Sequence, residues 1–168
     1  DYDENTWISL SWKEYGERVL RWRRAFHALG YRHGDRVAML LTNCIDAVTF
    51  DQSAMANALV PVPLHAIDTP GSSAYILHDS DARFLITTSL ARWNAIVKAA
   101  EDSRLSLDEL DTVVIINEVI PEDTVHQVFD HKVQVMDIEK WLLKANAIAE
   151  SELPAGPTPD DLCELIYT

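Results

Sequence analysis

Residues 36–64 read RVAMLLTNCIDAVTFDQSAMANALVPVPL, and their pattern indicates the fold class. It begins with a continuous apolar run, residues 37–41, which is typical of a strand buried on both faces. A helix is predicted at residues 44–58, and its inward-facing residues are expected to be Ile45, Val48, Met55 and Leu59. Residues 60–64 predict a short strand, which Pro61 and Pro63 confine to a sheet edge or a strand end.

The alternation of strands and helices continues along the rest of the chain. Further strands are predicted at residues 83–87, 112–117, 132–136 and 162–168. Three further helices are predicted: one at residues 72–80, one that begins after the capping residue Ser89, and one that begins after the capping residue Asp137. Residues 118–131 are expected to form a polar surface loop. Strands separated by such helices indicate an α/β fold, with a mostly parallel sheet of about five or six strands and helices on its faces.

The chain opens with a predicted amphipathic helix. Ser11 and Glu14 form a capping box, and Gly30 supplies the stop. The apolar face comprises Tyr15, Val19, Trp22, Phe26 and Leu29. The arginines at positions 18, 21, 23 and 24 are expected to form a solvated face with i,i+4 pairs from Glu14 to Arg18 and from Glu17 to Arg21, rather than a basic docking patch.

Composition and charge restrict the class of protein. The 168 residues are enough for one domain. The net charge of −13, from 14 basic and 27 acidic residues, argues against a nucleic-acid partner, because phosphate binding relies on cationic patches. No apolar run approaches the ~18 residues that span a bilayer, and no signal-peptide pattern is present. Cys44 and Cys163 are expected to be buried reduced thiols rather than a disulfide, as fits a cytoplasmic protein.

Motifs that carry chemistry are mostly missing from the chain. Its five glycines form no phosphate-binding or dinucleotide-binding pattern, and there is no Gly-x-Ser-x-Gly nucleophile motif. His126, Asp130 and His131 suggest a metal site, but solvation on a polar loop is the favoured interpretation. Asp79 and Asp81 suggest a general acid/base pair, but surface capping is favoured. The sequence therefore predicts no catalytic residue and no metal ligand.

The last part of the chain carries a resemblance to a known family. A connector at residues 151–159 precedes Asp160-Asp161, the apolar strand and Tyr167-Thr168. This order resembles the lead-in to the phosphate-binding loop of the AMP-forming acyl-activating enzymes, in which Tyr-Thr is followed by Ser-Gly-Thr-Thr-Gly-x-Pro-Lys-Gly. Residues 10–15, 34–38 and 55–64 resemble further segments of that family, with a departure at Asn57 and Ala58. Residues 1–168 are thus identified as the amino-terminal α/β portion of the large domain.

A finer resemblance points within the family. Residues 68–71 and 74–82, which include Asp-Thr-Pro-Gly and Ala-Tyr-Ile-Leu-His-Asp-Ser, are similar to the long-chain fatty acyl-CoA synthetases. The resemblance implies a parent enzyme that activates a fatty acid with ATP and Mg²⁺ to an acyl-adenylate and transfers the acyl group to coenzyme A. It implies that Thr168 begins the ATP phosphate loop and that His65, Ala66 and Arg92 border the coenzyme A entrance. The chain alone is expected to be inactive and to bind none of these cofactors.

Alternative interpretations stay open at this stage. The parent can be another acyl-CoA, aryl-CoA or adenylate-forming ligase of the same family, or the chain can be a flavodoxin-like binding domain or a non-catalytic interaction domain. The ligase interpretation implies a cytoplasmic protein, with peripheral contact to the inner face of the membrane for the parent. An uncovered apolar edge at residues 162–168 predicts a homodimer of this chain, and the alternative is a frayed terminus after the proline-rich connector.

Overall fold

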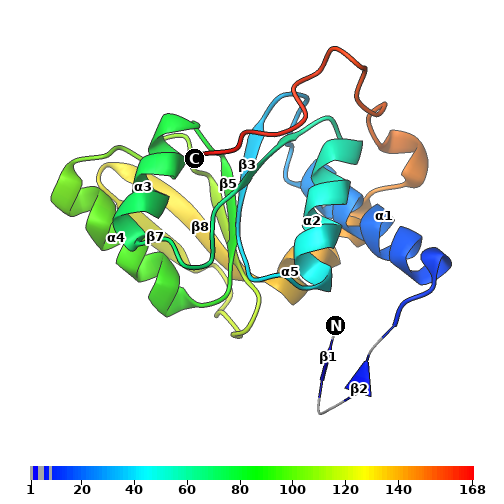
Figure 1. Cartoon of the computed structure of the whole chain (residues 1–168), viewed down its shortest axis with the longest axis horizontal. Coiled ribbons are helices and arrows are strands. Elements are labelled where there is room, and N and C mark those ends of the chain that lie inside the picture. Colours follow the sequence, from blue (N-terminus) through cyan, green and yellow to red (C-terminus); the bar gives the residue numbers. More distant parts are fainter. Residues whose placement is uncertain (1, 4–5, 8) are drawn as a thin grey trace.

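A computed structural model describes residues 2–3, 6–7 and 9–168, and its centre is a six-stranded sheet in the order β4-β3-β5-β6-β8-β7 (Figure 1). The strands are β3 (Arg36–Leu40), β4 (Val60–Pro63), β5 (Phe84–Thr87), β6 (Thr112–Ile115), β7 (Val125–Val128) and β8 (His131–Asp137). All neighbours pair in parallel except β7, which is antiparallel to β8. The predicted α/β fold is confirmed. A separate antiparallel pair, β1 (Tyr2–Asp3) and β2 (Thr6–Trp7), precedes it.

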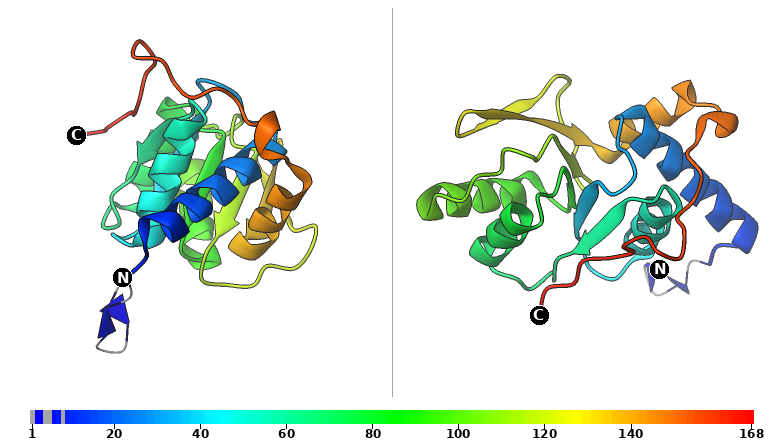
Figure 2. Two further views of the ribbon diagram at one scale, coloured as in Figure 1. Left: turned by 90° about the vertical axis from the view of Figure 1, so that its right-hand side faces the viewer. Right: turned by 90° about the horizontal axis from the view of Figure 1, so that it is seen from above.

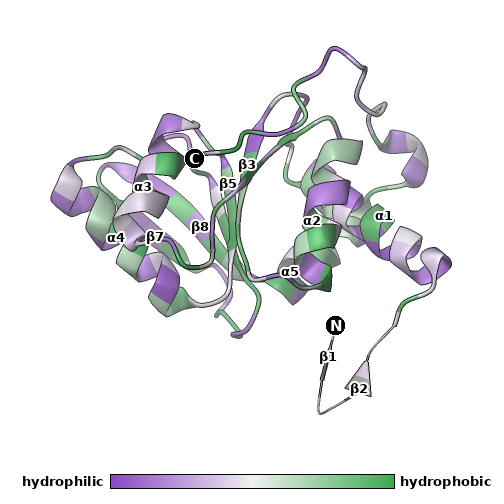
Figure 3. Ribbon diagram, in the orientation of Figure 1, coloured by the Kyte–Doolittle hydropathy of each residue, from purple (hydrophilic) through white to green (hydrophobic). Residues whose placement is uncertain are grey.

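Helices cover both faces of the sheet, so the fold has three layers (Figure 2). One outer layer contains α1 (Trp12–Ala28), α2 (Ile45–Ala56) and α5 (Ile138–Leu143), and the other contains α3 (Pro70–Asp79) and α4 (Leu90–Ser103). Short 3-10 turns at Lys144–Ala147 and Glu150–Glu152 follow α5. Each layer buries its own apolar cluster against the sheet, whose strands are mainly apolar (Figure 3).

The strand order places the first strand of the large sheet between the second and the third. This arrangement is the flavodoxin-like order, in which the direction of winding reverses between β3 and β5. Topology alone therefore does not separate a ligase portion from the flavodoxin-like alternative, because one architecture hosts many functions.

Helix α1 begins and ends as its sequence predicts. The Glu14 N–H donates to Ser11 Oγ over 3.2 Å, and the Ser11 N–H donates to Glu14 Oε2 over 2.8 Å. Gly30 follows the helix with a φ of 81°, a conformation in which a Cβ is costly. The buried face carries Trp22 and Phe26, and Phe26 packs edge-on against Trp141 at a centroid distance of 4.9 Å. This aromatic packing fixes α1 on the sheet.

Three of the four arginines of α1, at positions 18, 23 and 24, are half-buried against neighbouring elements, whereas Arg21 is exposed as predicted. Arg18 pairs with Asp46 at the start of α2, and the Arg23 guanidinium donates to Asn57 Oδ1 over 2.9 Å. The Asn57 amide in turn donates to the Arg23 carbonyl over 2.8 Å. The prediction of i,i+4 pairs from Glu14 and Glu17 is wrong, because α1 is flanked by α2 on one side and by the segment after α5 on the other.

Helix α2 presents a different face to the core from the one predicted. Its buried residues are Thr49, Phe50, Ser53 and Ala54. Val48 is exposed, and the predicted inward face through Ile45, Val48 and Met55 is wrong; Leu59 is buried but follows the helix. Apolar residues occur on more than one side of this helix, and the contact of Phe50 with Phe26, at 5.6 Å between centroids, decides its rotation.

Residues 118–131 do not form only a loop. Residues 125–128 form β7, which pairs with β8 through register partners such as Val128 and His131. Val128 is buried, and Phe129 adopts a positive φ of 51° at the turn that joins the two strands. The polar composition of β7 reflects its place at the sheet edge, where one side of the strand faces solvent.

The predicted strand at residues 162–168 is wrong. These residues form no strand, and Leu162 and Ile166 are exposed. The segment lies beside β4, where the Leu165 N–H donates to the Pro61 carbonyl over 3.0 Å. On β4, Val60 and Leu64 donate towards β3, so the outward positions are those of Pro61 and Pro63. Proline has no N–H, and this edge therefore offers acceptors but no donors to a further strand.

Two sequence expectations concern the thiols and the membrane. Cys44 and Cys163 are free thiols as predicted, but Cys163 is exposed and Cys44 is half-buried, so their predicted burial is wrong. Within the described residues, no helix has the length and apolar character needed to cross a bilayer.

Candidate ligand site at the carboxyl end of strand β4

Open α/β sheets bind ligands outside the carboxyl ends of their strands. A cavity of about 580 Å³ lies beyond the carboxyl end of β4. We call it the β4-end cavity. It is lined by His65, Asp68, Gly71, Ser72, Tyr75, Ile76, Tyr167 and Thr168. Its volume lies within the range of small-molecule sites. Two of the four predicted site residues, His65 and Thr168, line it although they are far apart in sequence.

The wall after β4 is a short turn that leads into α3. The His65 N–H donates to Asp68 Oδ2 over 3.0 Å, and the Asp68 N–H donates back to the His65 carbonyl over 2.9 Å. Thr69 then caps α3 by accepting from the Ser72 N–H over 3.1 Å, and Pro70 occupies the first turn. The local sequence Asp-Thr-Pro thus closes the turn and starts the helix, which holds this wall in place.

The predicted rim residues come together at this wall. Arg92 lies in the first turn of α4, whose N-cap is Ser89, and its guanidinium donates to the Ala66 carbonyl. Arg92 therefore lies against the turn that carries His65 and Ala66. An arginine has five N–H donors, so this contact leaves others to bind an anion.

The opposite wall comes from the last two residues of the chain. The Tyr167 hydroxyl donates to Asp79 Oδ2 over 2.8 Å, and the Tyr75 hydroxyl donates to Asp79 Oδ1 over 3.3 Å. Partial burial and the bond to the Asp79 anion raise the pKa of Tyr167 to about 12. Sequence reasoning missed the roles of Tyr75, Asp79 and Tyr167; the i,i+4 spacing of Tyr75 and Asp79 was the available signal.

The other candidates from the sequence have separate structural partners. Asp79 binds the two tyrosines, whereas Asp81 pairs with Arg36 at 3.5 Å, so they do not act as one acid/base pair. The expected solvation of His126 and His131 is wrong. His126 accepts from Trp93, and His131 Nε2 lies 3.0 Å from the Leu110 carbonyl. No group of three or more metal-ligating side chains occurs in the part of the chain that the structure describes.

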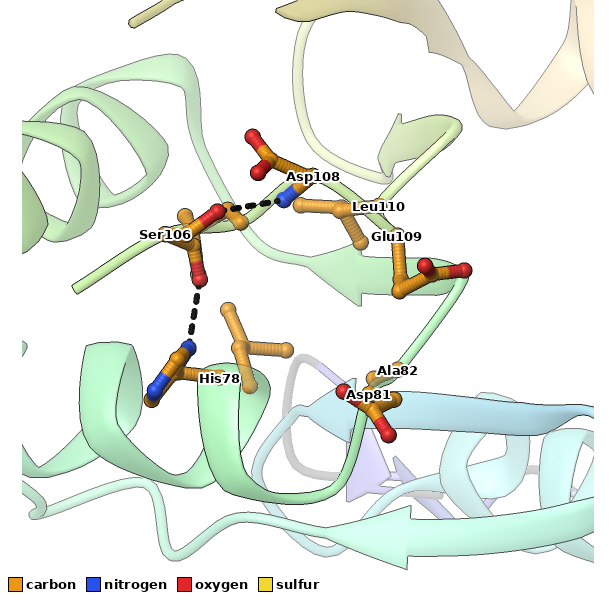
Figure 4. Close-up of a pocket in the computed structure, with 9 residues that line it drawn as sticks. His78, Asp81, Ala82, Ser106, Asp108, Glu109 and Leu110 are labelled. Carbon is orange, nitrogen blue, oxygen red and sulfur yellow. Dashed lines mark hydrogen bonds between the residues drawn. The ribbon is translucent and has the colours of Figure 1, made fainter.

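A smaller cavity, of about 170 Å³, lies at the opposite ends of the strands, beside the residues that precede β5 and β6 (Figure 4). It is formed by the end of α3 and the segment before β6, where His78 Nδ1 lies 2.8 Å from the Ser106 carbonyl. Its charged lining consists of the carboxylates Asp81, Asp108 and Glu109, besides His78. It opens beside the amino-terminal ends of β5 and β6, and its acidic lining does not suit a phosphate or carboxylate ligand.

Comparison with known proteins decides the family. The model of the family described as AMP-binding enzyme matches residues 2–168. The chain belongs to the AMP-binding enzyme family. The resemblance inferred from residues 160–168 and the earlier segments is therefore confirmed.

Two relatives and one solved structure illustrate the range of this family. The chain is 25% identical over 159 residues to crotonobetaine/carnitine–CoA ligase of Salmonella paratyphi A, covering 95% of this chain and 28% of the relative. It is 26% identical over 163 residues to fatty acyl-CoA synthetase A of Dictyostelium discoideum, covering 95% of this chain and 22% of the relative. The anthranilate CoA ligase AuaEII, solved with anthranoyl-AMP, shares the fold with a TM-score of 0.70 at 21% identity, over 93% of this chain and 26% of that one. The chain thus spans about a quarter of the length of these proteins.

Proposed function

We propose that this chain is the amino-terminal part of an adenylate-forming acid–CoA ligase, and that Thr168 begins the ATP phosphate loop beside the β4-end cavity. The observation that carries the proposal is the family match that extends to Thr168, together with the position of Thr168 in the cavity lining. A carboxylate is a poor acyl donor, and adenylation by ATP converts it into a reactive mixed anhydride. In this proposal the chain supplies the frame from which the phosphate loop extends.

The described residues fit the proposed ligands only in part. A phosphate loop binds through successive backbone N–H groups that glycines leave accessible, and the described residues contribute only Thr168 to it. ATP and Mg²⁺ therefore need residues beyond this chain, and the chain alone should be inactive. Coenzyme A carries anionic phosphates, for which the guanidinium of Arg92 is a suitable partner beside His65 and Ala66.

We propose a long-chain fatty acid as the substrate of the parent enzyme. The similarity to a fatty acyl-CoA synthetase and the fatty-acid-type segments at residues 68–71 and 74–82 support this choice. The similarity to crotonobetaine/carnitine–CoA ligase makes a short polar acid the second candidate. A fatty acid substrate favours a cytoplasmic enzyme with peripheral membrane contact.

The proposed function is tested by extending the chain and measuring its reaction. The codons after Thr168 should encode Ser-Gly-Thr-Thr-Gly, and the extended protein should catalyse acid-dependent exchange of pyrophosphate into ATP. Palmitate, anthranilate and carnitine are compared at equal concentrations, and palmitate is expected to give the fastest exchange. The 168-residue chain serves as the inactive control. A stop codon after Thr168, or no exchange with any acid, contradicts the proposal.

The coenzyme A rim has a separate test. Arg92→Ala in the extended enzyme should raise the apparent KM for coenzyme A about tenfold while leaving the adenylation step unchanged, because a phosphate contact of a guanidinium is worth roughly 1.5 kcal/mol. Lys98→Ala, at an exposed position of the same helix, is the matched control. An unaltered KM for coenzyme A in the Arg92 variant removes this residue from the site.

We also propose that the chain forms a homodimer through the edge beside β4, where Leu162 and Ile166 are exposed. Sedimentation velocity across a hundredfold range of concentration tests this assembly. A monomer at every concentration contradicts it.

A further inference from the structure

The carboxylate of Asp79 joins two segments that are far apart in the sequence. Asp79 is the last residue of α3, where an anion is unfavourable because the helix dipole places partial negative charge at its carboxyl end. Each carboxylate oxygen nevertheless accepts a tyrosine hydroxyl: Tyr75 from the preceding turn of α3, and Tyr167 from 88 residues further along. These two bonds offset the unfavourable position of the anion.

Residues 162–168 have few other anchors in the described structure. The segment lacks strand pairing, and its backbone contact to the sheet is the bond from the Leu165 N–H to the Pro61 carbonyl. The side chains of Leu165 and Tyr167 pack against the apolar cluster beneath α3 and α4. The Tyr167 ring thus enters the edge of that cluster while its hydroxyl reaches Asp79.

We propose that Asp79 is a positioning residue that, through Tyr167, fixes the backbone from which the phosphate loop begins. This inference rests on the proposed function. Thr168 is one peptide unit, about 3.8 Å between Cα atoms, from Tyr167, so restraint of Tyr167 restrains Thr168. Tyr75 also lines the β4-end cavity, and the shared carboxylate therefore holds two walls of that cavity at a fixed separation.

The energetic reason for such a residue lies in the geometry that adenylation requires. Reacting groups must be held close to a productive arrangement, and a displacement of about 1 Å at the loop can cost about a hundredfold in rate. The edge of β4 cannot supply this restraint with a full strand ladder, because Pro61 and Pro63 have no N–H. The Asp79–Tyr167 bond supplies it from α3 instead.

The first test measures the restraint in the 168-residue chain. Tyr167→Phe and Asp79→Ala both remove the hydrogen bond between Tyr167 and Asp79, and each should accelerate hydrogen exchange at the Leu165 amide about fivefold. Tyr15→Phe removes a hydroxyl bond of similar exposure elsewhere, to the Val48 carbonyl, and should leave this exchange unchanged. Equal exchange at Leu165 in the parent chain and in both site variants overturns the proposal.

A second readout tests whether the Asp79 carboxylate is the hydrogen-bond partner of the Tyr167 hydroxyl. Ring-labelled tyrosine NMR follows the ionisation of Tyr167, which Asp79 opposes by its negative charge. Asp79→Asn removes that charge and should lower the pKa of Tyr167, whereas Asp81→Asn, which alters the acid paired with Arg36, should change it less. An unchanged Tyr167 titration in the Asp79 variant overturns the assignment.

The final test separates this proposal from the proposed function. In the extended enzyme, Asp79→Ala should raise the KM for ATP and lower the rate of pyrophosphate exchange by about tenfold, and Asp79→Glu should restore part of it. If the Leu165 amide responds but these kinetic constants do not, Asp79 anchors the segment without positioning the loop, and the proposal is overturned. If the unsubstituted extended enzyme shows no exchange with any acid, the function fails whatever the behaviour of Leu165.

Discussion

The indole Nε1 of Trp93 donates a hydrogen bond to Nδ1 of His126 over 2.9 Å, and the two rings stack with centroids 6.4 Å apart. Trp93 lies fully buried on α4, and His126 lies on β7 at the edge of the sheet. The bond therefore holds the antiparallel β7–β8 hairpin against the layer formed by α3 and α4. It also satisfies an indole N–H that would otherwise be buried without an acceptor.

Removing the acceptor should destabilise the protein. His126→Ala leaves the Trp93 donor unsatisfied and should lower the free energy of unfolding by about 1–3 kcal/mol, measured by urea denaturation. Lys132→Ala, at an exposed position of the same hairpin on β8, is the matched control and should change it by less than about 0.5 kcal/mol. Equal effects of the two substitutions would show that the bond has no energetic role.

The hydrogen bonds of the Asp137 carboxylate predict that the protein loses stability in acid. Burial alone would raise the pKa of this carboxyl, but hydrogen bonds from the N–H groups of Lys140, at 2.9 Å, and Ile120, at 3.1 Å, together with the Lys140 ammonium, hold it below its usual range. A lowered pKa contributes stability above the unfolded value of about 3.9, and the contribution is lost as the pH falls through the folded pKa.

The test compares Asp137→Asn with the parent chain at pH 7 and near pH 2.5. The variant should be less stable by about 1–2 kcal/mol at pH 7, and the difference should shrink at the lower pH, because the unfolded chain then binds a proton that the folded carboxylate resists. Glu139→Gln, an exposed acid two residues later, should show no such dependence. A constant difference at both pH values contradicts the assignment.

The burial of the Tyr31 phenol predicts that the protein loses stability in alkali. Burial raises the pKa of its phenol, whose hydroxyl donates to the Arg83 carbonyl over 3.2 Å. The folded protein holds this proton more tightly than the unfolded chain does, so the free energy of unfolding should fall as the pH rises above about 10. Tyr31→Phe should flatten this decline between pH 9 and pH 11 in urea titrations. An equally steep decline in the variant would assign the effect to other tyrosines.

The prolines at the edge of β4 predict that residues 162–168 will gain strand structure when Pro61 and Pro63 are replaced. Replacing Pro61 and Pro63 together with valine introduces two outward N–H donors, so residues 162–168 should form a ladder with β4. Hydrogen exchange of the new amides at positions 61 and 63 should be slowed relative to solvent-exposed amides, as NMR can measure. As a control, replacing only Pro70, at the start of α3, with valine should leave the hydrogen exchange of residues 162–168 unchanged. Unprotected amides at both positions would show that proline does not limit pairing here.

The α/β class, the central strands and most helix boundaries followed from local sequence, because apolar runs, capping residues and turn residues act within a few residues of one another. The capping box of Ser11 and Glu14 formed as predicted, and so did the strand that begins near Arg36. The resemblance at residues 160–168 also indicated the family correctly, since short motifs keep their order whatever the contacts around them.

Long-range packing set which side of α2 faces the core, where β7 pairs, and whether residues 162–168 join the sheet. It also decided that His65 and Thr168 line one cavity and that Asp79 binds Tyr167. Each of these outcomes depends on partners far away in the sequence: Phe26 for α2, β8 for β7, and the donor-free edge at Pro61 for the last segment. Local propensity cannot encode them, because their free energy comes from contacts that exist only once the layers have packed.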